Sequence, residues 1–304
     1  MTMNYQDTYY DHFSKRSTKT PPQFKEDQNY LMRFHAPLSS YTFENNNLTI
    51  IYFKNGVGEL RWKNKRVEIK GERFIITNPS LGWEYINSKA KPIDVLSLVI
   101  NEKFRKQFHF FKTSSSLRQL DDPWGEDAPA SFFLEKPLIS SYYKSGQLLQ
   151  RIHQLSSDSM FQFTSPKELA IDVLTSIYQD QYHGYALASR VQAKKPSTQL
   201  ETFKRLLIAY EYIYDNINNP ITLEELSNVS SLSKFHLYNS FKNVYGQTPH
   251  QYINRLKVAK AKECIQRGEN SIGEIANQFG FNDISVFSKV FKKICGKPPS
   301  HYLN

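Results

Sequence analysis

ITLEELSNVSSLSKFHLYNSFKNVYGQTPHQY, residues 221–252, is followed by a second version of the same pattern, SIGEIANQFGFNDISVFSKVFKKICGKPPSHY, residues 271–302. The two copies keep a constant register over their second halves, in which Phe241 corresponds to Phe291. Each copy predicts a helix, a tight turn and a second helix. A tandem of this unit indicates a protein that contacts DNA at two places.

Capping residues mark the helix boundaries in both copies. Thr222 and Ser271 are each followed three residues later by a glutamate, which is the pattern of a capping box. Ser233 and Asp283 are expected N-caps of the second helix in each copy. These second helices are expected to end at glycines, which adopt the left-handed conformation at low cost: Gly246 and Gly296.

A single long helix is predicted between the two copies. It covers residues 249–267, starts at a proline preceded by the cap Thr248, and is closed by Gly268. At about 1.5 Å per residue its length is roughly 28 Å. One DNA turn is about 34 Å, so a helix of this length holds two reading helices at a spacing suited to successive major grooves.

The last hundred residues resemble the DNA-binding domain of the AraC/XylS family of transcriptional regulators. The second copy carries the more specific match, with Ile275-Ala276, Gly280-Phe281 and Phe287-Ser-Lys-Val-Phe291. In the first copy, Ser227 stands where the family usually has alanine and Asn239 where a basic residue is common. These departures bear on base preference and not on the fold. The alternative is a helical domain that packs against a protein partner.

Two sets of side chains are expected to contact DNA. Base contacts are assigned to second-helix positions that face away from the apolar core and match the base-reading positions of the family: Phe235, Tyr238, Asn239, Ser285, Ser288 and Lys289. Phosphate contacts are assigned to lysines: Lys234, Lys242, Lys257, Lys292 and Lys293. We expect the first copy to specify the sequence and the second to add phosphate affinity.

The amino-terminal part has a different pattern. Residues 48–100 contain short extended runs separated by turn residues such as Asn55-Gly56, which predicts an antiparallel barrel or sandwich. Together with the C-terminal resemblance, residues 1–112 are similar to the cupin-like domain in which family members hold an effector. Aromatic rings can stack on a ligand and arginine can pair with an anion. The ligand-binding candidates are Tyr52, Trp62, Arg73 and Trp83.

Two helices are predicted after the strands, over residues 136–160 and 165–192. The resemblance implies that the region 113–192 serves dimerisation, with Leu148, Ile152 and Leu155 offering an apolar face; packing against the barrel is the alternative. Residues 193–200 are polar and contain a proline, which predicts a linker before the DNA-binding domain at 201–304. The expected fold class is therefore a two-domain α+β chain. It comprises an N-terminal antiparallel β-barrel, cupin-like, with following helices, and an all-α domain with two helix-turn-helix motifs joined by a long helix.

Composition is consistent with a polyanionic partner in a reducing compartment. The chain has 304 residues, with 39 basic against 29 acidic residues and a net charge of +10. The surplus is not concentrated in residues 201–304, so net charge alone is weak support. Only two cysteines occur, which disfavours a disulfide scaffold. No apolar run reaches about 18 residues and the N-terminus lacks a secretory apolar core. These features predict a cytoplasmic protein without a membrane partner.

Enzyme chemistry is not expected. Metal-binding cupins need clustered histidines, yet the chain has no His-x-His and residues 48–100 contain no histidine. No catalytic residue, metal site or cofactor is predicted. The sequence predicts a sequence-specific regulator of transcription, and the resemblance implies an effector-responsive, homodimeric activator that acts on promoter DNA with RNA polymerase. The alternatives are a constitutive regulator whose N-terminal domain only dimerises, and a cupin-type small-molecule enzyme.

Overall fold

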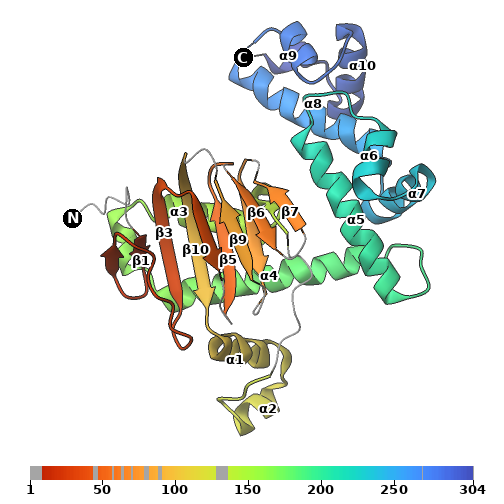
Figure 1. Ribbon diagram of the computed structural model, residues 1–304. Helices are drawn as coiled ribbons and strands as arrows, with labels where there is room; N and C mark the ends of the chain where they lie inside the picture. The colour runs from red at the N-terminus through yellow and green to blue at the C-terminus, as the bar shows by residue number, and fades with distance from the viewer. Residues whose placement is uncertain are drawn as a thin grey trace. The chain divides into compact units, whose positions relative to one another are not determined.

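The computed structural model describes residues 9–303 except 44–46, 57, 63–64, 70, 79–81, 88–90, 128–135 and 269, and leaves undescribed the side chains of residues 43, 62 and 65. The chain divides into two compact units, Met1–Tyr182 and His183–Asn304. The first contains antiparallel sheets and helices, and the described part of the second is helical, which confirms the mixed α/β organisation (Figure 1). Within the described residues, no helix is both long and apolar enough to span a bilayer.

The first unit contains two antiparallel sheets. The larger has the order β11-β8-β5-β10-β3-β1-β2. Its strands, in that order, are Leu138–Ile139, Arg73–Thr77, Leu48–Phe53, Pro92–Ile100, Tyr30–Pro37, Tyr9–Asp11 and Arg16–Thr18. The smaller has the order β4-β9-β6-β7. Its strands are Ser40–Phe43, Trp83–Ile86, Glu59–Trp62 and Lys65–Glu68.

Strand β5 shows that the large sheet is covered on both faces. All six residues of its sequence LTIIYF are buried, as expected for a strand with packing on either side. Ile51 and Phe53 point into the core between the sheets, where they join Trp83 and Tyr85 of β9. On the other face of the large sheet lies α3 (Lys144–Leu155), which contacts β5, β8 and β10.

The segment predicted as one helix over residues 136–160 is instead four short elements. Leu138 and Ile139 of β11 pair with Phe74 and Arg73, which extends the large sheet by one strand. The turn of 3-10 helix η1 (Ser140–Tyr142), α3 and a second 3-10 helix η2 (Ser159–Phe163) follow. Ile152 is only 2% exposed because α3 packs on the sheet, so at this residue the alternative of packing against the sheet holds and a free apolar face does not.

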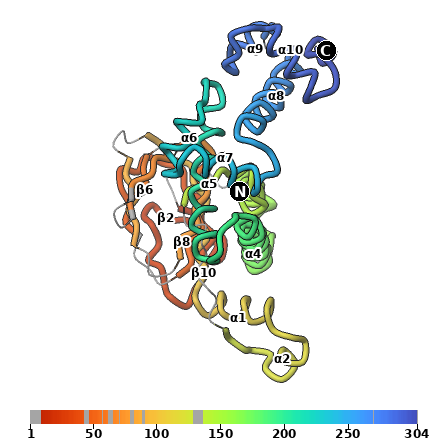
Figure 2. Tube along the Cα trace, turned by 90° about the vertical axis from the view of Figure 1, so that its right-hand side faces the viewer, coloured from red at the N-terminus to blue at the C-terminus, as the bar shows by residue number. Residues whose placement is uncertain are grey.

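Three further helices complete the first unit and lead into the second. Helices α1 (Glu102–Thr113) and α2 (Ser116–Asp121) lie beyond one end of the sheets (Figures 1 and 2). The long helix α4 (Pro166–Ala188) covers most of the second predicted helix. Helix α5 (Pro196–Asp215) begins with proline in its first turn, so residues 196–200 are helical and not part of a linker.

The remaining helices of the C-terminal unit are two pairs on either side of a long helix. The first helix pair is α6 (Leu223–Ser230) and α7 (Lys234–Tyr245), and the second helix pair is α9 (Ile272–Gln278) and α10 (Ile284–Cys295). Helix α8 (Pro249–Arg267) runs between the pairs, and a short 3-10 helix, η3 (Pro299–Tyr302), follows α10 (Figures 1 and 2). The predicted bounds of α8 are confirmed.

The predicted helix caps are confirmed by their hydrogen bonds. The Glu225 backbone N–H donates to Thr222 Oγ1 at 3.1 Å, and the Thr222 N–H donates back to Glu225 Oε2 at 2.7 Å. Ser271 and Glu274 form the same capping box. The backbone and hydroxyl hydrogen bonds from Thr222 and Ser271 lower the pKa of Glu225 and Glu274. Both caps therefore keep their charged form to a lower pH than an ordinary glutamate.

The turn inside each helix pair contains one residue in the left-handed conformation, and the two turns use different residues. Ser231 has a φ of 53° in the first, whereas Gly280 has a φ of 68° in the second. A Cβ at Gly280 would also lie 3.1 Å from Lys257 Nζ and 3.3 Å from the Asn219 carbonyl carbon. The first turn is therefore strained by its side chain, while the second is not.

We predict opposite stability effects at these two positions. Ser231→Gly removes the left-handed strain and should raise the free energy of unfolding by about 0.5–1 kcal/mol, after the entropy cost of glycine. Gly280→Ala introduces that strain beside a crowded contact and should lower it by about 1–2 kcal/mol. Denaturant unfolding of both variants measures the difference. A shift in the same direction for both would contradict the assignment of strain.

Candidate nucleic-acid interface

Helix α7 has a buried face and an exposed face that follow the helical period. Leu237 and Phe241 are fully buried against the neighbouring helices. On the outer face, Phe235 is 80% exposed and Tyr238 is 41% exposed, while Asn239 is half-buried. The structure thus brings the three predicted base-contacting side chains of the first helix pair onto the side of α7 that is free to meet a partner.

Helix α10 is arranged in the same way. Phe287 and Phe291 are fully buried, in a core shared with α8 and α9. Ser285 and Lys289 are exposed and Ser288 is half-buried. The predicted base-contacting residues of this helix therefore also lie away from its core, on one outer surface.

Two exposed apolar residues in the first turn of α10 received no role from the sequence prediction. Ile284 is 50% exposed and Val286 is 51% exposed. Neither residue lies on the buried stripe formed by Phe287 and Phe291. An apolar residue outside the buried stripe of a helix is the signal in the sequence that could have identified them. An apolar side chain in the major groove can contact the methyl group of thymine. These two residues are thus candidates for base contact through shape and not through hydrogen bonds.

Four of the five predicted phosphate-contacting lysines are exposed. Lys242, Lys292 and Lys293 are exposed on α7 and α10. Lys234 is also exposed, and its Nζ lies 3.0 Å from Glu224 Oε2. An ion pair between two exposed side chains contributes only about 0–1 kcal/mol. Lys234 would therefore lose little free energy if it left Glu224 to contact a phosphate oxygen.

Lys257 is the exception, and the structure corrects its assignment. Its side chain is only 5% exposed, and its Nζ donates a hydrogen bond to the Asn219 carbonyl oxygen at 3.1 Å. The ammonium also lies 5.6 Å from the centre of the Phe281 ring, and burial lowers its pKa. A cation held in this way cannot reach a phosphate. It instead joins the middle of α8 to the segment before α6 and to the turn before α10.

Two other lysines of α8 also contact neighbouring segments. Lys260 Nζ lies 4.0 Å from the centre of the Tyr214 ring at the end of α5, and Lys262 Nζ lies 4.5 Å from the Tyr302 ring. Such cation–π contacts contribute about 0.5–1 kcal/mol at exposed sites. These two lysines thus contact α5 and the C-terminal 3-10 helix.

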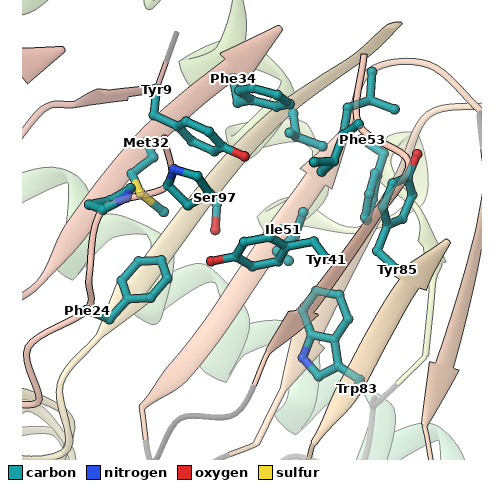
Figure 3. Close-up of a pocket in the computed structure, with 15 residues that line it drawn as sticks. Tyr9, Phe24, Met32, Phe34, Tyr41, Ile51, Phe53, Trp83, Tyr85 and Ser97 are labelled. Atoms are coloured by element: carbon teal, nitrogen blue, oxygen red, sulfur yellow. The ribbon is translucent and has the colours of Figure 1, made fainter. Parts of the chain in front are cut away.

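A separate, apolar cavity lies between the two sheets of the first unit (Figure 3). Of the predicted ligand-binding residues, Trp83 lines this cavity. Tyr52 and Arg73 are buried but do not line it; the Tyr52 ring lies 5.3 Å from the His153 ring of α3. The side chain of Trp62 lies outside the described residues.

The C-terminal unit matches known helix-turn-helix proteins. Residues 226–304 match the family model described as a helix-turn-helix domain. The raffinose operon transcriptional regulatory protein RafR of Pediococcus pentosaceus is 29% identical over 118 residues, which cover 39% of this chain and 43% of RafR. The multiple antibiotic resistance protein MarA of Escherichia coli (strain K12) is 30% identical over 92 residues, which cover 30% of this chain and 72% of MarA.

Among solved structures, the C-terminal domain of the response regulator yesN from Fusobacterium nucleatum is 30% identical, with a TM-score of 0.31. The match covers 32% of this chain and 94% of that domain. The chain spans 43%, 39% and 30% of the length of RafR, LumQ of Photobacterium leiognathi and the MmsAB operon regulatory protein of Pseudomonas aeruginosa. The match to the family model and the likeness to MarA define a protein with a helix-turn-helix domain of the DNA-binding type. The chain belongs to the AraC/XylS family of transcriptional regulators.

We predict that Lys257 and Lys292 respond differently to mutation. Lys257→Met leaves the Asn219 carbonyl without its donor and should lower the free energy of unfolding by about 1–2 kcal/mol. It should leave the slope of log K against log salt for DNA binding unchanged. Lys292→Ala should instead reduce the magnitude of that slope by about 0.9, the value for one phosphate contact.

The measurement is a salt titration of DNA affinity at a temperature where both variants are folded. Circular dichroism provides the check on folding. A reduced salt dependence of DNA affinity in Lys257→Met would show that Lys257 contacts a phosphate after all.

Proposed function

We propose that this chain is a sequence-specific DNA-binding transcription regulator whose α7 and α10 enter successive major grooves as parts of two helix-turn-helix motifs. The observation that carries the proposal is that each end of the 19-residue helix α8 supports one helix pair with an exposed polar and cationic face. At about 1.5 Å per residue, α8 is roughly 28 Å long. This is close to the spacing of about 34 Å at which one side of a duplex presents two half-sites.

The exposed side chains divide into two roles. Asn239 is suited to adenine and Lys289 to guanine, whereas Phe235, Ile284 and Val286 are suited to the thymine methyl group. The remaining base contacts are those of hydroxyl groups: Tyr238, Ser285 and Ser288. The exposed lysines at 234, 242, 292 and 293 contact phosphates and supply affinity without sequence information. Because Ile284 and Val286 in the first turn of α10 offer no hydrogen-bonding side chain, we expect α7 to make the stronger base selection.

We predict that base preference and general affinity are separable by mutation. Asn239→Ala and Lys289→Ala should each relax preference at one position of the site, at a cost of about 1–3 kcal/mol for the preferred base. Lys292→Ala should weaken all sequences to a similar degree.

Binding-site selection from random oligonucleotides, carried out with all three variants and the unmodified chain, measures both effects. The stronger consensus should lie in the half-site contacted by α7. Unchanged preference in both Asn239→Ala and Lys289→Ala would exclude these residues as base contacts. A stronger consensus under α10 would contradict the expected division of roles.

The regulatory properties are inferred from the family and from the first unit. Family membership supports an activator that binds promoter DNA as a homodimer in the cytoplasm and acts with RNA polymerase. The apolar cavity between the sheets supports a response to a small-molecule effector. An effector changes DNA binding only to the extent that it binds one arrangement of the protein more tightly. A constitutive regulator remains the competing proposal. It is distinguished by a DNA affinity that no ligand of the cavity changes.

Exposed apolar side chains near the end of α3 provide a candidate dimer surface. Met160 is 65% exposed, Phe163 is 73% exposed and Leu155 is 49% exposed. All three lie in the region 113–192 that the family resemblance associates with dimerisation. We therefore propose these three exposed residues, and not the buried Ile152, as the dimer interface. Dimerisation would bring two tethered DNA-binding units to one promoter and raise the apparent affinity without new contacts.

We predict that Phe163→Glu gives a folded monomer, whereas Ile152→Glu unfolds the first unit because it buries a charge against the large sheet. Analytical ultracentrifugation at tens of micromolar measures the association state. Circular dichroism measures folding. A dimeric Phe163→Glu protein would remove this surface from consideration, and a monomeric unmodified chain would exclude the dimer.

A further inference from the structure

The cavity between the sheets has an uncharged lining. It is formed by fifteen described residues from both sheets and from the segment at Pro21, Pro22 and Phe24, and none of the fifteen carries a charged side chain. Aromatic rings from both sheets surround it, among them Phe34, Phe53 and Trp83 (Figure 3). About 530 Å³ of atom-free space lies among these residues, including open solvent at the mouth. Such a space suits an apolar ligand better than a cluster of water molecules.

One polar group in the cavity has no partner. Ser97 of β10 is 8% exposed, and its Oγ is buried without a hydrogen bond. Figure 3 shows the Ser97 side chain directed into the space between the Tyr9 and Tyr41 rings. A hydroxyl group buried without a partner lowers stability because its hydrogen bonds to water are lost and not replaced. A ligand that offers a hydrogen bond to Ser97 would recover part of that cost.

The other hydroxyl groups of the lining stay neutral. Burial, and then the neighbouring Tyr41, raises the pKa of Tyr9. Burial also raises the pKa of Tyr41, and it raises the pKa of Tyr85 to about 12. At neutral pH the cavity therefore offers hydroxyl groups but no charge. A carboxylate or ammonium that entered it would lose its hydration and meet no opposite charge, so its binding is disfavoured.

We propose that this cavity binds an uncharged, mainly apolar ligand with a single hydroxyl or carbonyl group hydrogen-bonded to Ser97. The proposal excludes ligands that carry a carboxylate, so it departs from the prediction that Arg73 pairs with an anion in this domain. A role of this ligand in regulation rests on the effector response proposed above. The binding of the ligand to the cavity does not depend on that response.

Three probes that share a methyl-substituted ring test this chemistry: p-cresol, toluene and p-toluate. Isothermal titration of the full chain at pH 7 should show that p-cresol binds about fivefold more tightly than toluene, the gain of one net hydrogen bond. It should show no binding of the charged p-toluate. Equal affinity for p-cresol and toluene, no binding of p-cresol, or binding of p-toluate as tight as that of p-cresol would overturn the proposal.

A matched pair of serine variants tests the role of Ser97. Ser97→Ala should remove the preference for p-cresol over toluene and leave the affinity for toluene unchanged. Ser176→Ala is the control, because Ser176 in α4 is also 8% exposed but its Oγ donates to the Val173 carbonyl oxygen at 2.8 Å, away from the cavity. This variant should keep the preference. A preference retained in Ser97→Ala would assign the hydrogen bond to another group.

One further measurement separates this proposal from the proposed function. DNA affinity is measured with and without saturating p-cresol. If p-cresol binds with the expected selectivity and DNA affinity is unchanged, the ligand class holds and the effector response fails for this ligand. If DNA is bound with the proposed specificity but no probe enters the cavity, the DNA-binding function holds and the ligand proposal fails.

Discussion

The C-terminal unit depends on α8, the rigid helix to which both helix pairs are attached. Its start is fixed by a capping box at Thr248 and its end by Gly268 in the left-handed conformation. Near its middle, the buried ammonium of Lys257 holds the carbonyl of Asn219 and lies against Phe281. The two helix pairs therefore share one support. The buried Lys257 ammonium thus has a structural role: it connects α8 to the segment before α6 and to the turn before α10.

Local signals made the C-terminal unit predictable from sequence. The caps Thr222, Ser233 and Asp283 and the terminal glycines act through hydrogen bonds to residues within four positions, so their effect can be read from the sequence. The bounds of α8 and the exposed faces of α7 and α10 followed from these caps and the helical period. The burial of Lys257 did not, because its partner Asn219 is 38 residues away and only the folded chain brings them together.

The first unit was less predictable because its contacts are non-local. Leu138 and Ile139 carry the apolar character of a helix stripe, but they pair with Phe74 and Arg73 and become a strand. In β5 every residue is buried, so the alternation that would separate the cavity face from the helix face is missing. The sequence therefore predicts a ligand contact at Tyr52, which faces α3, and gives no signal for Ile51 and Phe53, which line the cavity. Ser97 was missed since an unpaired hydroxyl leaves no pattern in a sequence.

The apolar first turn of α10 has a consequence for epigenetic marking. Thymine and 5-methylcytosine carry the same methyl group at the same edge of the major groove. In the proposed binding mode, Ile284 and Val286 have no hydrogen-bonding group with which to tell the two bases apart, so they respond to the methyl group itself. If α10 binds in that way, methylation of a cytosine in its half-site would raise the affinity. A promoter could then change its occupancy without any change in its base sequence.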